Sequence, residues 1–167
     1  NTKYLNIKCI KHVTPNDKQH DIYGPAITYY HPNGTISHIA YYINDQQHNE
    51  HGPAVIYYRT NGMISRTDHY IDGQRHNING PAVTVYNSDG TISRTDHYIN
   101  DKLHNINGPA ITYYNPDGTI SGVEYWKGNR RHNEYKPAVI NYHENGDIDY
   151  VDYYHDGVKV EVANHNN

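Results

Sequence analysis

The 167-residue chain contains no phenylalanine and only two leucines, Leu5 and Leu103. Isoleucine (18 residues) and valine (10 residues) supply nearly all of its aliphatic side chains. So few large aliphatic residues are typical of disordered chains when the net charge is high. Here the formal net charge is only -4, and 19 tyrosines add apolar area. Because tyrosine packs its ring while its hydroxyl reaches water, we expect an ordered structure with a thin core and a large wet surface.

Three further absences exclude classes of protein. Cys9 is the single cysteine, which excludes an internal disulfide framework and favours a reducing compartment. No apolar run approaches the roughly 20 residues of a membrane-spanning helix, and no signal peptide is evident. We therefore expect no integral membrane segment and an intracellular location rather than secretion. The pI near 6.4 and the lack of a lysine and arginine stripe argue against nucleic acid as the partner.

The strongest signal that is present is a repeat with a period of 28 residues. The dipeptide Gly-Pro occurs at 24–25, 52–53, 80–81 and 108–109, and Lys136-Pro137 takes the next place in step. Six other positions recur with the same spacing: Ala26, Ala54, Ala82, Ala110 and Ala138; Tyr30, Tyr58, Tyr86, Tyr114 and Tyr142; Gly34, Gly62, Gly90, Gly118 and Gly146; Ile36, Ile64, Ile92, Ile120 and Ile148; Tyr42, Tyr70, Tyr98, Trp126 and Tyr154; and His20, His48, His76, His104 and His132. Such recurrence predicts one structural unit used again and again.

Each unit is predicted to be a pair of strands. Runs such as 109–114 and 64–71 are rich in β-branched and aromatic residues. The string Asn115-Pro-Asp-Gly118 between two such runs is typical of a type I turn followed by a left-handed glycine, which makes a three-residue hairpin loop. The second connection carries pairs such as Asp72-Gly73, which is again hairpin chemistry. The predicted fold is therefore all-β: an elongated, single-layer antiparallel meander of β-hairpins with ten strands.

The period also predicts the organisation of the chain. We expect an N-terminal half-repeat cap at residues 1–23, five hairpin repeats and a polar tail at 164–167. The repeats are 24–51, 52–79, 80–107, 108–135 and 136–163. Since each hairpin contacts mainly its neighbours, stability should be roughly a sum of unit and interface terms.

The predicted turn also implies a register and two faces. It places Tyr30 opposite Ile36, Thr28 opposite His38, and Ala26 opposite Ala40. One face then carries the positions that recur almost unchanged, which we interpret as the packing face: Ala26, Tyr30, Ile36 and Tyr42. The other face varies between units and is interpreted as free for a partner: Ile27, Tyr29, Ser37, Ile39 and Tyr41.

The string Tyr70-Ile-Asp-Gly-Gln-Arg-His76, followed by Gly80-Pro-Ala-Val and Asn-Ser-Asp-Gly90, resembles MORN repeats. It is most similar to the longer MORN-like variant common in proteins of giant DNA viruses; related repeats occur in antitoxin-type bacterial proteins. The likeness covers about residues 15–160. The chain departs from the usual pattern at Asp68 and its equivalents, where MORN units tend to hold glycine, and in its longer unit. The resemblance implies elongated β-meanders that serve protein association and scaffolding, sometimes lipid contact, and no catalysis.

Aromatic and histidine side chains of the variable face are the candidate partner-binding residues. Aromatic residues are enriched at interaction hot spots, but tyrosine also covers an open sheet while keeping it soluble, and the sequence leaves both roles open. The candidates are Tyr29, Tyr41, Tyr57, His69, His97, Tyr113, Tyr125 and Tyr153.

The histidine column invites a metal interpretation, which spacing opposes. Successive rings should lie two strands apart, near 10 Å, whereas a zinc–nitrogen bond is about 2.1 Å. We therefore expect no metal, and expect each of these histidines to hydrogen-bond its own turn. A chelating pair, His48 with His51, is the alternative. A pH switch at His69 and His97 is a further hypothesis, since unperturbed histidine titrates near 6.5.

Catalytic and cofactor-binding residues are not expected. The acidic column contains Asp68, Asp96, Glu124 and Asp152. We predict that its members pair with Arg66 and Arg94 as exposed ion pairs worth about 0–1 kcal/mol, because residues i and i+2 of a strand share a face. No nucleophile, general base or phosphate-cradling loop converges in the pattern.

The leading functional hypothesis is a non-enzymatic scaffold that associates with protein partners, including copies of itself. The MORN resemblance alone adds a virion-associated or host-interacting role in a giant virus. Two alternatives are an antitoxin or immunity-type protein that blocks an enzyme, and a carbohydrate-binding module. Lipid is the weaker ligand because the net charge is negative.

Overall fold

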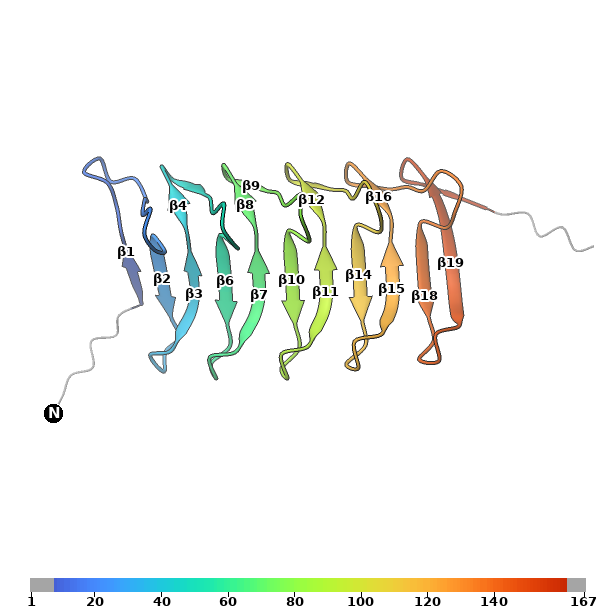
Figure 1. Ribbon diagram of the computed structural model, residues 1–167, viewed down its shortest axis with the longest axis horizontal. Coiled ribbons are helices and arrows are strands. Elements are labelled where there is room, and N and C mark those ends of the chain that lie inside the picture. Colours follow the sequence, from blue (N-terminus) through green and yellow to red (C-terminus); the bar gives the residue numbers. More distant parts are fainter. Residues whose placement is uncertain (1–7, 162–167) are drawn as a thin grey trace, which may run out of the picture.

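The computed structural model describes residues 8–161, which form an all-β structure without helices. Twelve antiparallel strands lie side by side in one long sheet, in the order β1-β2-β3-β6-β7-β10-β11-β14-β15-β18-β19-β20 (Figure 1). The predicted meander of hairpins is thus confirmed, with two strands more than the ten expected. Residues 1–7 of the predicted cap, the end of the fifth repeat and the predicted tail at 164–167 lie outside the described residues.

The strands of the long sheet are short, and those from equivalent positions have equal length in the first four units. They are β1 (Cys9–Lys11), β2 (Ile27–Tyr30), β3 (Ile36–Ala40), β6 (Val55–Tyr58), β7 (Ile64–Asp68), β10 (Val83–Tyr86), β11 (Ile92–Asp96), β14 (Ile111–Tyr114), β15 (Ile120–Glu124), β18 (Val139–Tyr142), β19 (Ile148–His155) and β20 (Val158–Val160). The half-repeat supplies β1, which pairs with β2.

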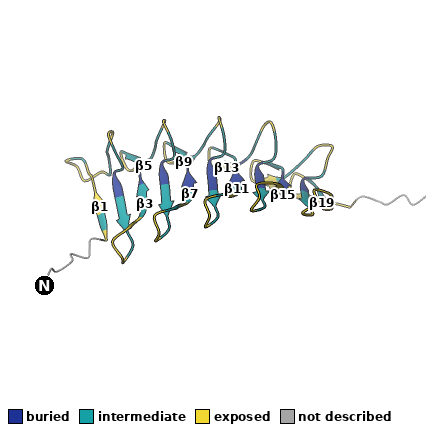
Figure 2. Cartoon of the chain, turned by 60° about the horizontal axis from the view of Figure 1, so that its bottom comes forward, coloured by how far each residue is buried: buried dark blue, intermediate teal, exposed yellow. Residues whose placement is uncertain are grey.

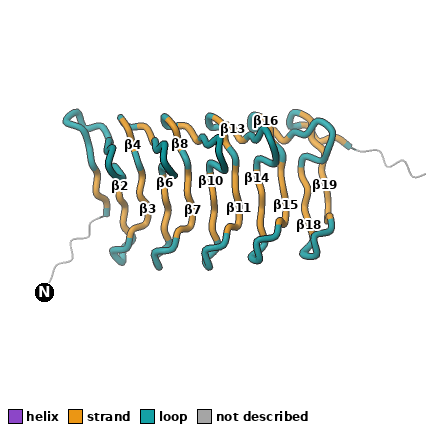
Figure 3. The backbone as a smooth tube through the Cα atoms, in the orientation of Figure 1, coloured by secondary structure: helices purple, strands orange, loops and turns teal. Residues whose placement is uncertain are grey.

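The loop inside each unit has the predicted geometry. In the first unit the backbone N–H of His31 donates to the Thr35 carbonyl at 2.8 Å, and that of Gly34 donates to the His31 carbonyl at 2.9 Å. Gly34 has a φ of 85°, the left-handed conformation that glycine adopts without steric cost. We call the five equivalent loops, which share one edge of the sheet (Figure 3), the lower turns: 31–35, 59–63, 87–91, 115–119 and 143–147.

Above each lower turn the sheet contains a β-bulge that the sequence analysis missed. Tyr30 does pair with Ile36, as predicted, but the register then shifts, so that Tyr29 pairs with His38. Ser37 is the extra residue. Its equivalent Ser65 donates from the hydroxyl to the Tyr57 carbonyl at 3.3 Å. The same shift occurs in all five hairpins of the sheet.

The bulge makes the predicted register wrong beyond the first pair. Ile27, not Ala26, pairs with Ala40, and Thr28 pairs with Ile39 rather than His38. A slip of one residue exchanges the two faces of a strand, so the predicted face assignment holds for one strand of each hairpin only.

Two faces follow from the observed pairing. The Arg–Asp face carries Val55, Tyr57, Arg66, Asp68 and their equivalents. The threonine face carries Ile56, Thr67 and their equivalents, including Thr84, Thr95 and Thr112. The isoleucine column predicted to pack is instead exposed; Ile64 retains 38% of its accessible surface.

The second connection of each unit forms a separate small hairpin. These hairpins are β4 (Tyr42–Ile43) with β5 (Gln46–Gln47), β8 (Tyr70–Ile71) with β9 (Gln74–Arg75), β12 (Tyr98–Ile99) with β13 (Lys102–Leu103), and β16 (Trp126–Lys127) with β17 (Arg130–Arg131). Both turn residues have positive φ, as in Asp72 (49°) and Gly73 (78°). This is typical of the two-residue turns that suit twisted hairpins.

Burial is concentrated where the small hairpins meet the sheet (Figure 2). Leu103 packs with Ala110 and Ile111, and Tyr98 and Trp126 pack around them. All five alanines of the repeated column are fully buried. The core is therefore a thin line repeated along the sheet. Among the described residues, no helix exists that is long and apolar enough to cross a membrane.

The histidine column joins neighbouring units. Nδ1 of His48 lies 3.2 Å from the backbone nitrogen of Asp72, which belongs to the small hairpin of the next unit. Equivalent contacts join His20 to Asn44 at 3.3 Å and His132 to Asp156 at 3.1 Å. The prediction that each histidine binds its own turn is therefore wrong, because the partner lies one unit further along.

Candidate functional site

The segments that contain the Gly-Pro motif form loops along the edge opposite the lower turns. An asparagine shapes each loop: Asn77 donates from Nδ2 to the Pro81 carbonyl at 3.0 Å, and its Oδ1 accepts from the Asn79 backbone N–H at 3.0 Å. Asn49, Asn105 and Asn133 make equivalent bonds. We call segments 20–25, 48–53, 76–81, 104–109 and 132–137 the upper loops.

This loop geometry turns large apolar side chains toward solvent. Ile78 and Ile106 each keep 76% of their accessible surface, and Ile22 keeps 64%. Tyr23 and Tyr135, one position later in their loops, keep 95% and 90%. Burial of apolar area is favourable, and exposed apolar residues gathered at one site often mark an interaction surface.

Between successive upper loops lies an open groove that recurs with the sequence repeat. Its walls are two successive loops, and its floor comes from the small hairpin between them. The first groove contains Asp21, Ile22, Tyr41, Ile43 and His48–His51. The second contains Asn77, Ile78, His97, Ile99 and His104–Asn107. The third contains His104–Gly108, Tyr125–Lys127 and His132–Glu134. Positions 28 residues apart thus play the same part in each groove.

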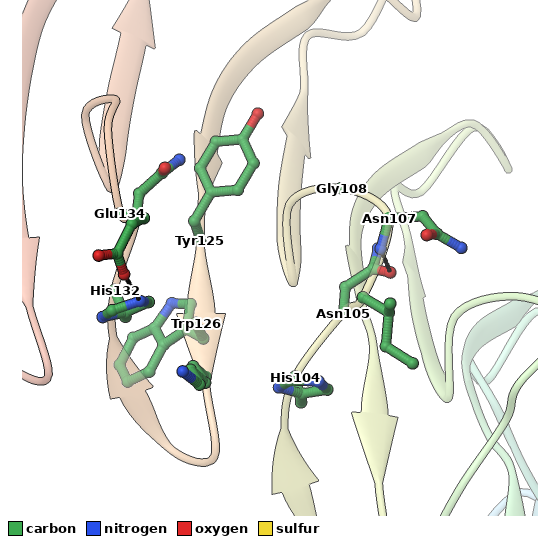
Figure 4. A pocket seen from close by; sticks show the side chains of 11 residues that line it. His104, Asn105, Asn107, Gly108, Tyr125, Trp126, His132 and Glu134 are labelled. Carbon is green, nitrogen blue, oxygen red and sulfur yellow. Dashed lines mark hydrogen bonds and ion pairs between the residues drawn. The ribbon is translucent and has the colours of Figure 1, made fainter.

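The third groove is the largest, with a volume of about 520 Å³. In Figure 4, Asn105 and Asn107 stand on one side, and His132 and Glu134 on the other. Nε2 of His132 lies 3.5 Å from a Glu134 carboxylate oxygen. An isoleucine on one wall and a charged pair on the other give this groove a mixed apolar and polar lining.

Five of the eight predicted partner-binding residues belong to this row of grooves. Tyr41, His97 and Tyr125 line the first, second and third grooves. The other two, His69 and Tyr153, occupy the equivalent positions of units 2 and 5. All five are half-buried, so each presents part of its ring to the groove.

Burial lowers the pKa of His69 and of His97, because a charged imidazole is disfavoured away from water. The neighbouring carboxylates of Asp68 and Asp96, and hydrogen bonds with the Gly52 and Gly80 backbone, act in the opposite direction. The lowered pKa keeps both rings neutral at neutral pH, which suits them to contact an apolar partner.

The other three predicted residues, Tyr29, Tyr57 and Tyr113, lie on the Arg–Asp face and are engaged within the chain. Tyr29 stacks on His38 with ring centroids 4.2 Å apart, and His38 in turn stacks on Tyr57 at 5.4 Å. The Tyr113 hydroxyl donates to Oε1 of Glu124 at 3.2 Å. The structure therefore divides the predicted residues between two faces.

The acidic column pairs as predicted but is buried rather than exposed. Asp68 accepts two hydrogen bonds from Arg66, at 2.6 and 2.9 Å, and only 1% of its side chain is accessible. Arg94 and Asp96 repeat this arrangement. In the fourth unit Glu124 instead accepts from Trp126 and Arg131 at 2.9 and 3.0 Å. These bonds account for the carboxylates as structural groups.

The sequence analysis missed the exposed isoleucines and the asparagines that hold the upper loops. A signal was present in the string Asn77-Ile-Asn-Gly-Pro81 and again in Asn105-Ile-Asn-Gly-Pro109, where one apolar residue interrupts a polar turn. Asparagine there favours a turn closed by its own side chain, and such a turn leaves the next residue outside.

Comparison with known proteins found no matching family model and no significantly similar curated protein. The MORN resemblance stays a prediction.

Proposed function

We propose that this chain is a non-enzymatic repeat scaffold that associates with another protein through the row of grooves between its upper loops. The observation that carries the proposal is the recurrence of one groove, with exposed apolar side chains on its rim, at three unit junctions. A row of equal sites binds a long partner better than any single site does, because later contacts form at high effective concentration.

The spacing of the grooves indicates the kind of partner segment. Neighbouring grooves are two strands apart, or about 9.6 Å. In a polyproline II segment every third residue returns to the same side after about 9.3 Å. An extended protein segment with an apolar residue at every third position would therefore place one side chain in each successive groove, while the loop asparagines hydrogen-bond its backbone.

The Arg–Asp face is the weaker candidate surface. Its tyrosines already stack on neighbouring rings or donate to carboxylates, and arginines cover them; Arg94, for example, lies 5.5 Å from the Tyr113 ring. Binding there would have to break these contacts first. The upper loops present Ile78 and Ile106 with most of their surface exposed.

Affinity capture with matched variants tests the proposal. The chain is immobilised and exposed to lysate of its native source, and retained proteins are quantified for wild type, for Ile78→Asp with Ile106→Asp, and for Ile64→Asp with Ile92→Asp. The second pair lies near the lower turns of the same two units and is exposed by 38% and 39%. We expect the first double variant to lose a partner that wild type and the control retain.

Equal retention by all three proteins, or no retained protein, would contradict the proposal. Retention of an enzyme whose activity the chain inhibits would favour the antitoxin-type function, and loss of capture on adding free sugars would favour the carbohydrate-binding function. On the likeness to MORN-like repeats alone, the proposal extends to a virion-associated or host-interacting protein of a giant virus.

A further inference from the structure

At the C-terminal end of the sheet, two imidazoles and a carboxylate converge. His132 follows β17, while His155 ends β19 and Asp156 begins the turn to β20. Their possible ligand atoms all lie within 4.8 Å of one another. Nδ1 of His132 is 3.3 Å from Oδ1 of Asp156, and Nδ1 of His155 is 3.7 Å from Oδ2 of the same carboxylate. The two rings are 4.9 Å apart and tilted by 58°.

These separations suit a small metal ion. With metal–ligand bonds of about 2.0–2.1 Å, tetrahedral coordination places neighbouring ligand atoms about 3.4 Å apart. Imidazole nitrogen with carboxylate oxygen is a donor set for zinc and similar divalent transition metals, whereas calcium and magnesium prefer oxygen alone. Small side-chain movements would thus bring the three ligands onto one ion.

A second carboxylate lies on the other side of both rings. Oε2 of Glu134 is 3.5 Å from Nε2 of His132 and 3.7 Å from Nε2 of His155. A ligating histidine commonly donates its other ring N–H to such a group, which orients the ring and raises its basicity. Metal binding would replace the bond from the Asp156 backbone N–H, which reaches Nδ1 of His132 at 3.1 Å.

The repeat supplies its own comparison. His48 has both carboxylates in equivalent places: Nδ1 is 3.0 Å from Asp72, and Nε2 is 3.6 Å from Glu50. The position of His155, however, is filled by Ile71, and in the remaining units by Ile43, Ile99 and Lys127. The terminal unit therefore differs from the second unit in holding a second imidazole at this place.

We propose that His132, His155 and Asp156 bind one divalent transition-metal ion, with zinc as the best match, and that Glu134 supports the two imidazoles. The ion would fasten the turn between β19 and β20 to the preceding unit. That turn carries the last strand of the sheet, whose outer edge has no neighbour among the described strands. Repeat arrays need reinforcement at their ends, because a terminal unit is stabilised from one side only.

Calorimetric titration of the full chain with zinc chloride at about pH 7.5 tests the site. We expect one stoichiometric equivalent for wild type, none for His155→Ile and about tenfold weaker binding for Glu134→Gln. Ile71→His should add a second equivalent, because it completes the same ligand set around His48 and Asp72. Cobalt absorption spectra of the same proteins should show tetrahedral coordination.

Each variant has a structural control. His155 is 54% exposed, and isoleucine occupies its place in three other units, so His155→Ile should retain the circular dichroism spectrum and cooperative unfolding of wild type. If it fails to fold, Ile71→His carries the test. Absence of a stoichiometric equivalent in wild type, an unchanged equivalent in folded His155→Ile, or no second equivalent in Ile71→His would each overturn the proposal.

Discussion

His76 of the second unit contacts Asn100 of the third: Nδ1 is 2.8 Å from Oδ1 of Asn100 and 3.4 Å from its backbone nitrogen. Contacts of this kind recur along the array and cross the boundary between units. Stability of the array should therefore depend on them as interface terms.

We expect His76→Ala to lower the free energy of unfolding by about 0.5–1.5 kcal/mol, the usual net value of a hydrogen bond. His51→Ala is the control, since His51 is exposed and its side chain has no hydrogen bond among the described residues; its effect should stay within about 0.5 kcal/mol. Urea denaturation followed by circular dichroism gives both values. Equal losses would show that the repeated histidines do not join the units.

Stability should fall on acidification because His69 and His97 are partly buried. Burial lowers the pKa of each in the folded state, so the folded chain binds fewer protons than the unfolded chain below about pH 6.5. Their contribution is complete above that pH and is lost as the pH falls toward the lowered values. We expect a lower melting temperature at about pH 5.5 than at about pH 7.5.

The double variant His69→Tyr with His97→Tyr should show a smaller drop between these two pH values. Tyrosine already occupies the equivalent positions as Tyr41 and Tyr125, so the fold accommodates it. His38, whose pKa burial also lowers, is present in both proteins and accounts for part of the remaining drop. An identical pH dependence in the two proteins would exclude His69 and His97 as its source.

The buried ion pairs of the Arg–Asp face should matter more than the exposed pair at the end of the sheet. Arg94→Met leaves the Asp96 carboxylate, 7% exposed, without its partner and should cost about 3 kcal/mol. Lys159→Met removes a bond to Asp152 from a lysine that is 56% exposed and should cost at most about 1 kcal/mol. Chemical denaturation of both variants provides the comparison, and similar losses would contradict the burial argument.

The sequence predicts the meander well because spacing reports which positions are equivalent. Gly34 and its counterparts indicate the lower turns, and Tyr30 pairs with Ile36 as predicted. Equivalence does not reveal register, however. The extra residue at Ser37 reverses the faces of the following strand, and only the recurrence of serine at this position in four units hints at it.

The candidate site was predictable in part for a similar reason. Tyr41, His97 and Tyr125 were found from their place on the variable face, although that face was assigned incorrectly. Ile78 and Ile106 were missed because a pattern of strands gives no account of loop shape. The burial of Asp68 also escaped prediction, since it depends on small hairpins whose packing against the sheet is a tertiary feature.

Hydrogen–deuterium exchange of the chain, alone and with a partner captured through it, tests the central claim most directly. If the row of grooves binds an extended segment, protection should appear in the upper loops 76–80, 104–108 and 132–136, and should recur with the 28-residue spacing of the sequence. Protection confined to the lower turns or to the strands of the Arg–Asp face would contradict the claim.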